Sequence, residues 1–303
     1  MKALKWVGIT IGGLVIVLIV AAGILFVISK QHENKIYHIE IASIPINFDD
    51  EDALYNGRHV ARVRGCVDCH GDHLGGDIFL EDPVVGVLVA TNLTKGPGGI
   101  GNEYSDEDLI RATRHGVRKD GKSVIFMPSH EYNLIDEKDL GDLIAYIRSK
   151  DPVNSNHLPE TKIGFPFRLI YVLSRGEIHL FPAMFIDHGV SVPPHVTERS
   201  PIETGAYLAT TCIGCHGPNY GGGIIPGVPP NWPAASNITM GGPLADYSES
   251  DFATVMRTGV TPDGRQLDGE FMPYTVFGYM TDEELAGLFE YLRTRPVRET
   301  GTR

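Results

Sequence analysis

The chain begins with one long apolar stretch and continues as shorter amphipathic stretches. The uncharged run from Trp6 to Ile28 holds 23 residues, enough for a helix to cross the hydrocarbon core of a bilayer, which is roughly 30 Å thick. Farther along, two stretches repeat apolar residues at i, i+3, i+4 and i+7, as a helix with one buried face does. These positions are Leu140, Leu143, Ile144 and Ile147, and Leu285, Leu288, Phe289 and Leu292. The pattern predicts a membrane helix followed by a helical body.

Polar residues and glycines mark the ends of further predicted helices. Three pairs have the spacing of an N-terminal capping pair: Ser105 and Asp108, Ser248 and Asp251, Thr281 and Glu284. The helices that start at the first two pairs are expected to end at Gly116 and Gly259. Gly57 and Gly205 lie in two earlier helical stretches, where they could let two helices cross closely. Because no alternating strand pattern competes, we expect an all-α fold.

We interpret the N-terminal apolar run as an uncleaved anchor rather than a signal peptide. It is longer than the roughly 7 to 15 apolar residues of a signal peptide, and no small-residue cleavage site precedes Lys30. Lys2 and Lys5 favour a cytoplasmic start of the chain, although Lys30 and Lys35 weaken the asymmetry. We therefore expect a single-pass protein of the cytoplasmic (inner) membrane, with the rest of the chain on the periplasmic or extracytoplasmic face.

After the apolar run, the chain repeats itself at an offset near 146 positions. The matched segments are Thr91 to Thr94 with Ser236 to Thr239, Tyr104-Ser105 with Tyr247-Ser248, Arg114 to Val117 with Arg257 to Val260, Asp120-Gly121 with Asp263-Gly264, and Phe126-Met127-Pro128 with Phe271-Met272-Pro273. Their order never changes, and the offset drifts only between 143 and 148, as small loop insertions would cause. The repeat indicates a duplicated domain.

All four cysteines fall in two copies of one motif. Cys66-Val67-Asp68-Cys69-His70 and Cys212-Ile213-Gly214-Cys215-His216 both read C-x-x-C-H. Two thiols at this spacing can add to the two vinyl groups of one porphyrin while the adjacent histidine reaches the iron. The motifs predict two covalently attached haem c groups, held by Cys66, Cys69, Cys212 and Cys215. His70 and His216 are the expected proximal iron ligands.

Three other interpretations of the cysteines are weaker. A chain of this length can bury a core without disulfides. A zinc site would need its two cysteine pairs closer together than Cys69 and Cys212. A thioredoxin-like redox pair would lie in an α/β pattern and would not need a histidine after the second thiol in both copies. The haem interpretation is therefore strongly favoured.

The residue on the opposite face of each iron decides the function. The candidates are a methionine, a second histidine or no residue. Of seven methionines, only Met127 and Met272 occupy matching positions, each between phenylalanine and proline. His115 and His130 are rivals in the first half only, because threonines stand at their matching positions. We expect Met127 and Met272 to complete the two iron sites, since two alike haems need the same ligands.

Two further matched pairs are candidates for supporting the haems. Pro83 and Pro229 each lie 13 positions after the proximal histidine. Their carbonyl oxygens could accept a hydrogen bond from the histidine ring, and a simple turn is the alternative. Arg114 and Arg257 could pair with haem propionates, although a solvated helix end explains them almost as well.

The segment from about residue 151 to residue 199 interrupts the repeat. It is rich in proline, and its apolar part, Phe165 to Ile186, also contains Arg168, Arg175 and Glu177. Those charges exclude a second membrane span. We interpret the segment as a packed strap between the two halves, and a surface that lies against lipid or a partner subunit is the alternative.

Each half resembles a class I cytochrome c domain. The shared features are a first helix with glycine, C-x-x-C-H-G, a Gly-Gly turn at Gly75-Gly76 and Gly221-Gly222, an Asn-Leu/Ile-Thr segment, Met-Pro and a terminal helix. The resemblance implies an all-α fold of two tandem class I cytochrome c domains after a transmembrane helix. The expected organisation is a transmembrane anchor at 1–30, a linker at 31–47, a first cytochrome c domain at 48–150, the strap at 151–198, a second cytochrome c domain at 199–297 and a tail at 298–303.

The chain is also similar to the membrane-anchored multihaem cytochrome c subunits of periplasmic alcohol and sugar dehydrogenases, which often have three haem motifs. This resemblance implies electron transfer between a respiratory donor, such as a dehydrogenase or a quinol-oxidising complex, and a downstream acceptor. Matching ligand sets favour an electron carrier over an enzyme, because the alternative, a dihaem peroxidase, needs two unlike haems. The formal net charge of −12 argues against nucleic acid and favours redox protein partners with basic surfaces.

Overall fold

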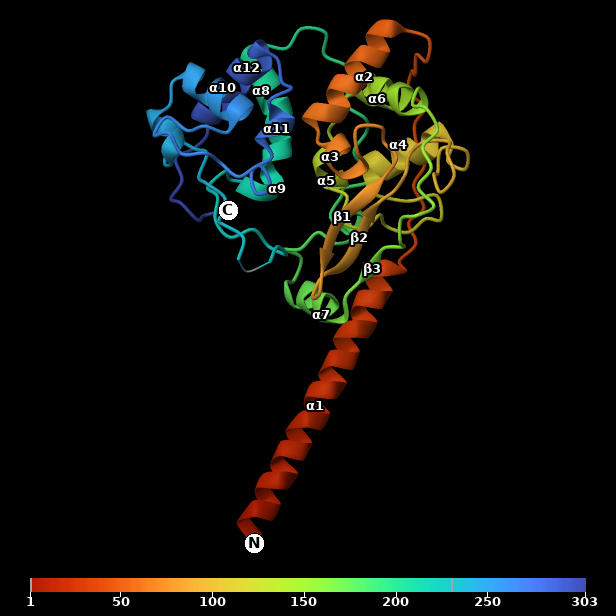
Figure 1. Ribbon diagram of the computed structural model, residues 1–303, viewed down its shortest axis with the longest axis vertical. Helices are drawn as coiled ribbons and strands as arrows, with labels where there is room; N and C mark the ends of the chain where they lie inside the picture. The colour runs from red at the N-terminus through yellow and green to blue at the C-terminus, as the bar shows by residue number, and fades with distance from the viewer. Residues whose placement is uncertain (1, 230) are drawn as a thin grey trace.

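The computed structural model describes residues 2–229 and 231–303. The first helix, α1 (Lys2–Glu33), projects from the body as one long rod (Figure 1). Its side chains from Leu4 to Val20 are exposed. Among the described residues, α1 is the one helix long and apolar enough to cross a membrane, by length and composition.

The first half of the body is built around two crossing helices, α2 and α6. Its helices are α2 (Glu51–Val63), α3 (Cys66–His70), α4 (Asp106–His115), α5 (Ser129–Tyr132) and α6 (Glu137–Arg148). The helices α2 and α6 meet at Gly57, where an added Cβ would fall 2.8 Å from the Cβ of Tyr146. Only glycine permits this approach, so the expected close crossing is confirmed.

The second half repeats this arrangement. Its elements are α8 (Pro201–Leu208), η2 (Ala209–Cys212), α9 (Ile213–His216), η3 (Pro243–Asp246), α10 (Glu249–Thr258), α11 (Tyr274–Phe277) and α12 (Asp282–Arg293). The helices α8 and α12 cross at Gly205, where a Cβ would fall 2.7 Å from the Cβ of Tyr291. The apolar stripes of α6 and α12 supply the cores of the two halves, as the periodicity predicted.

The predicted helix ends are confirmed. Ser105, Ser248 and Thr281 each form a complete capping box with the acidic residue three positions later. Gly116 and Gly259 end α4 and α10 with φ of 63° and 72°, a left-handed conformation that suits glycine.

The prediction of an all-α fold is wrong, because an antiparallel sheet of three strands is formed by the first half and the strap. The strands are β1 (Asp77–Asp82), β2 (Gly86–Ala90) and β3 (Lys162–Ile163), in the order β1-β2-β3. Asp77 pairs with Ala90 at one end of the β1–β2 hairpin, and Lys162 pairs with Val87. The valine-rich run before Ala90 favours extended backbone. A partner strand 70 or so residues away, however, cannot be read from local periodicity.

The strap packs on this sheet. It contains α7 (Phe165–Leu173) and the short turn η1 (Pro182–Met184). Phe167, Leu180 and Phe181 form a buried cluster with Val85 and Leu88 of the hairpin. The strap therefore adds a third core, between the sheet and its own helices, to the two cores of the halves.

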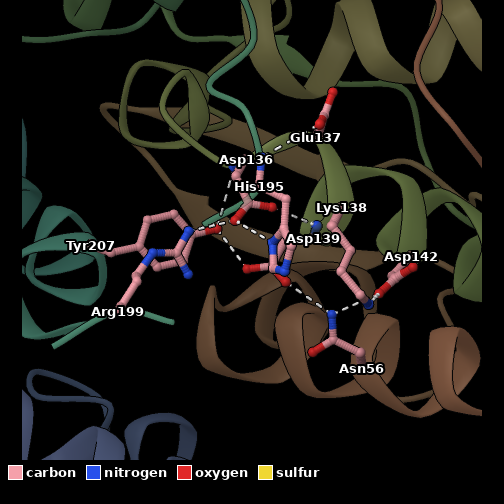
Figure 2. Close-up of polar contacts among 9 residues, drawn as sticks. All are labelled: Asn56, Asp136, Glu137, Lys138, Asp139, Asp142, His195, Arg199 and Tyr207. Carbon is pink, nitrogen blue, oxygen red and sulfur yellow. Dashed lines mark hydrogen bonds and ion pairs between the residues drawn. The ribbon is translucent and has the colours of Figure 1, made fainter. Parts of the chain in front are cut away.

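The two halves contact each other through reciprocal pairs. His59 on α2 lies 2.9 Å from Glu284 on α12. In turn, the hydroxyl of Tyr207 on α8 donates to Asp139 on α6 at 2.7 Å (Figure 2). Near them Asp136, buried at the start of α6, binds Arg199 and the ring of His195. Each half thus presents its first and last helices to the other.

Candidate functional site

The second C-x-x-C-H motif occupies η2 and the short helix α9. His216 is buried at the end of α9, where Gly217 turns the chain with φ of 78°. Its Nδ1 lies 2.7 Å from the carbonyl oxygen of Ser236. Burial lowers the pKa of the His216 ring, and the hydrogen bond to Ser236 opposes this in part. The ring is therefore neutral, with Nδ1–H donating and the lone pair of Nε2 left for a metal.

The first motif, on α3, has the same geometry. Nδ1 of His70 lies 2.7 Å from the carbonyl oxygen of Thr91. Burial lowers the pKa of this ring too, against a smaller opposite effect of the Thr91 bond. Within residues 2–229 and 231–303, neither Nε2 has a hydrogen-bond partner in the protein. Both histidines are thus oriented as ligands by a backbone carbonyl.

A polar loop holds each of these carbonyls in place. Asn92 accepts from the backbone N–H of Thr94 and donates to the carbonyl of Val153. Asn237 does the same with Thr239 and with the carbonyl of Arg298. The asparagines are 2 % and 1 % exposed, so each loop is anchored to the interior by its asparagine.

The turn after each motif recurs as well. Leu74 and Tyr220 are both buried and both left-handed, with φ of 54° and 59°. In each copy the N–H of the second glycine of the Gly-Gly turn, Gly76 or Gly222, donates to the carbonyl of the proximal histidine at 2.9 Å. Left-handed backbone at a buried non-glycine residue is uncommon, so its presence in both halves indicates a shared constraint.

The predicted role of the prolines is wrong. Pro83 lies in the turn that joins β1 to β2, and the acceptors of the histidine rings are Thr91 and Ser236 instead. The sequence contained a signal for these two acceptors, because Thr91 and Ser236 are the first residues of two segments that match in the repeat. The spacing of Pro83 and Pro229 after the histidines reflects the repeat alone.

The predicted role of the arginines at haem propionates remains a prediction, and both side chains also bind other groups of the protein. Arg114 is buried and donates to the carbonyls of Asn133, Val190 and Ser191, so it ties the strap to α4. Arg257 pairs with Asp282 at 2.5 Å and donates to the carbonyl of Met280. The two guanidinium groups are engaged within the protein and differ between the halves.

Each matched methionine lies against the core that its motif adjoins. Met272 is partly buried against the cluster that includes Cys212 and Tyr220. Met127 is partly buried against the cluster around Leu74, which Cys66 also contacts. Both methionines are followed by a proline and then a short helix, α5 or α11. In both halves, the motif and the methionine therefore border the same core.

The two rival histidines point toward the strap. Nδ1 of His115 lies 3.3 Å from Nδ1 of His188, and Nε2 of His130 lies 2.9 Å from Nδ1 of His179. Burial lowers the pKa of His115 and of His130 to about 4. These neutral rings stabilise the strap against the first half.

Two residues beside the second motif escaped the sequence analysis. Arg303 donates to the carbonyls of Gly214 and Cys215. It lies in the tail, outside the repeat, so no pattern pointed to it.

Glu131, which follows the Met-Pro of the first half, lies directly against Gly214. Burial raises the pKa of Glu131 to about 8. The short helix α5, which follows Met127 and Pro128 in the first half, therefore touches the cysteine motif of the second half.

The chemistry of the donors fits covalent haem. Burial raises the pKa of the Cys66 and Cys212 thiols to about 12, whereas thiolate redox pairs and thiolate metal sites need lowered values. Among the described residues no disulfide joins the four cysteines, and each pair adjoins an apolar core and a histidine whose Nε2 bonds no protein group. Residues of this kind can attach a porphyrin through thioethers and bind its iron.

Comparison with known proteins defines the class of the second half. The sequence model of the cytochrome c family matches residues 202–296, which include the second motif and Met272. Residues 202–296 are thus a cytochrome c domain. Such a domain binds haem c covalently and takes part in electron transport.

The curated relatives of the chain include cytochrome subunits of dehydrogenases. The chain is 28% identical to the "Alcohol dehydrogenase (quinone), cytochrome c subunit" of Gluconobacter oxydans (strain 621H), over 83% of this chain and 56% of that protein. It is 28% identical to the "Fructose dehydrogenase cytochrome subunit" of Gluconobacter japonicus, over 81% and 53%. It is 29% identical to the "Gluconate 2-dehydrogenase cytochrome c subunit" of Pantoea cypripedii, over 56% and 40%. The chain spans about half the length of the first two.

The family match also corrects the predicted architecture. It covers one half of the body, and the other half contains β1 and β2 and pairs with β3 of the strap. The expectation of an all-α fold made of two tandem class I cytochrome c domains is therefore wrong. The structure is a helical second half joined to a mixed first half.

Proposed function

We propose that this chain is a membrane-tethered electron carrier with two covalently bound haems, one in each half. The observation that supports a second haem is the recurrence of the histidine geometry. His70 and His216 each hold a 2.7 Å hydrogen bond from Nδ1 to a backbone carbonyl. A chance C-x-x-C-H sequence would have no reason to reproduce this bond, the asparagine loop behind it and the left-handed residue after it.

The residues that would hold the two haems are assigned by half. Cys66 and Cys69 would form the thioethers of the first, with His70 and Met127 on its iron. Their counterparts in the second half are Cys212, Cys215, His216 and Met272. Haem bound in this way supplies an iron centre that exchanges one electron. Histidine–methionine ligation raises the reduction potential and leaves no position for a substrate, so the protein acts as a carrier and not as an enzyme.

The protein supports transfer between its halves by direct contact. The packing of Glu131 against Gly214 brings α5 of the first half into contact with the cysteine motif of the second. The reciprocal pairs His59–Glu284 and Tyr207–Asp139 fix the halves in this orientation. Contact between the halves at Glu131 and Gly214 would connect them directly if an electron passes from one haem to the other.

The location and partners follow from α1 and from the relatives. The helix α1 would anchor the chain in the inner membrane, with the haem domains at 48–150 and 199–297 on the periplasmic side. The names of the relatives point to a dehydrogenase as the electron donor. A quinol-oxidising complex is the other donor class, and the net charge of −12 favours partners with basic docking surfaces.

The test is purification of the intact protein from membranes in mild detergent. We expect two covalent haems per chain by mass, reduction by a co-purifying dehydrogenase and no rapid turnover of peroxide. One haem per chain would contradict the proposal for the first half. A high-spin iron with fast peroxide turnover would favour the dihaem peroxidase.

A further inference from the structure

The helix α7 of the strap exposes large apolar residues and buries its one charged residue. Phe165, Ile170 and Leu173 face outward and are 52 %, 46 % and 64 % exposed. Its one charged residue, Arg168, is buried on the inner side together with Tyr171. A helix on the surface of a water-soluble domain shows the opposite pattern. The outward face of α7 is therefore suited to an apolar medium.

The inner side of α7 is fixed to the end of α1. Arg168 forms a 2.7 Å ion pair with Glu33 and donates to the hydroxyl of Ser29. The hydroxyl of Tyr171 lies 2.9 Å from Nδ1 of His32. These contacts are polar and buried, so the position of α7 relative to the last turns of α1 is set by the protein itself.

The contact between Phe165 and α1 sets the depth of α7. The ring of Phe165 lies 5.8 Å from the ring of Phe26, which belongs to the uncharged run. Phe26 and Glu33 are seven residues apart, so they differ in height by roughly 10 Å along the helix. Phe165 thus lies at the level of the apolar run, while Arg168 lies at its polar end. This is the depth range of helices that lie in the interface of a bilayer.

The hairpin extends the same surface. The turn between β1 and β2 lies beside the start of α7, because the N–H of Gly164 donates to the carbonyl of Val85 at 2.8 Å. Val84, at the tip of this turn, is 42 % exposed. Figure 1 shows α7 and the hairpin tip at the end of the body from which α1 emerges. Together they form a surface beside the exit of α1, here called the collar: Phe165, Ile170, Leu173 and Val84.

We propose that the collar lies in the headgroup and upper acyl region of the same bilayer that α1 crosses, and so gives the protein a second contact with lipid. The proposal rests on the membrane tether proposed above. Lipid is the occupant because the collar is continuous with the membrane span through Phe26 and Phe165. The contact holds the body in one orientation to the membrane plane, which a single flexible tether would not do.

Photo-crosslinking of the full-length haem protein tests this. A benzophenone amino acid replaces Leu173, and the protein is reconstituted in vesicles of phosphatidylcholine and phosphatidylglycerol that contain alkyne-tagged phosphatidylcholine. Ile16 of α1 is the positive control and Tyr55 of α2, which is 78 % exposed, is the negative control. We expect about tenfold more tagged lipid on position 173 than on position 55, because an interfacial residue touches lipid continuously.

The outcomes separate the two proposals. Label at position 16 without label at 173 overturns the collar and leaves the tether intact. Absence of label at both positions refutes the tether itself. If position 173 crosslinks to another protein and not to lipid in native membranes, the collar is a subunit interface and the proposal fails. Should the variant at 173 lose haem, the same measurement is made at Ile170, whose side chain is also outside the core.

Discussion

The imidazole Nε2 of His59 lies 2.9 Å from a carboxylate oxygen of Glu284, which is 225 positions further along the chain. The matching contact, from Tyr207 to Asp139, uses the corresponding helices with the halves exchanged. An interface in which each half offers the same surface is what a duplicated protein forms when its copies associate with two-fold symmetry. In addition to these pairs, Arg64, two positions before the first cysteine motif, donates to the hydroxyl of Thr210, two positions before the second.

The His59–Glu284 pair predicts a pH dependence of stability. The hydrogen bond to Glu284 raises the pKa of His59 above 6.5, and burial opposes it. For Glu284, burial acts to raise the pKa, but the contact with His59 lowers it from 4.5. The pair therefore contributes its full stability between about pH 4.5 and pH 6.5 and loses it as the pH rises through the folded pKa of His59. We expect His59→Gln to remove about 1 kcal/mol of stability at about pH 6 and much less at about pH 9. Urea unfolding followed by the haem absorption measures both values.

A pH-independent loss would show that His59 acts by packing alone. The control is Tyr207→Phe, which removes the hydrogen bond to Asp139 at the reciprocal position but no group that titrates near neutral pH. Its effect should stay constant across the same range.

Removal of one cysteine pair should remove one haem. We expect the double variant C66A/C69A to retain the haem of the second half, and C212A/C215A to retain that of the first, because each porphyrin is attached within its own motif. Intact mass and the pyridine haemochrome assay should each report half the haem of the parent protein. Two haems in either variant would contradict the assignment of the motifs.

The contributions of the two matched methionines to the absorption spectrum should be separable. If both bind iron, Met127→Ala and Met272→Ala should each remove about half of the far-red band of methionine-ligated ferric haem. Each variant should also bind carbon monoxide at one haem and show a lower potential there. Met240→Ala is the matched control, since Met240 is partly buried but has no methionine at the corresponding position. An unchanged band in Met127→Ala would exclude this residue as a ligand.

The crossing of α8 and α12 should not tolerate a methyl group. Gly205→Ala would put a Cβ 2.7 Å from the Cβ of Tyr291, so we expect a loss of about 1 to 3 kcal/mol of stability in the second half. Gly13→Ala on α1 gives the same gain in helix propensity with no atom within 4 Å, and it should leave the unfolding midpoint unchanged. Equal behaviour of the two variants would mean that the helices can separate without cost.

The parts of this protein that the sequence predicted correctly are those with short-range signatures. The apolar run to Ile28, the capping pair Ser105–Asp108 and the stripe on α6 depend on spacings within one element, and all three are present as expected. The two cysteine motifs are equally local, because their chemistry needs five consecutive residues. The repeat added one inference about distant residues, that Met127 and Met272 occupy matching positions. It was possible because the two halves can be compared with each other as two related sequences.

The remaining features depend on which distant segments meet. The sheet forms because Lys162 of the strap reaches Val87, and the acceptors Thr91 and Ser236 are selected by the path of a loop and not by its distance from the histidine. Arg114 binds the strap because the strap passes over it. Local sequence determined the motifs and the helices. The tertiary structure alone decided their hydrogen-bond partners and the orientation of the halves, because these are fixed by the lowest free energy of the whole packed chain.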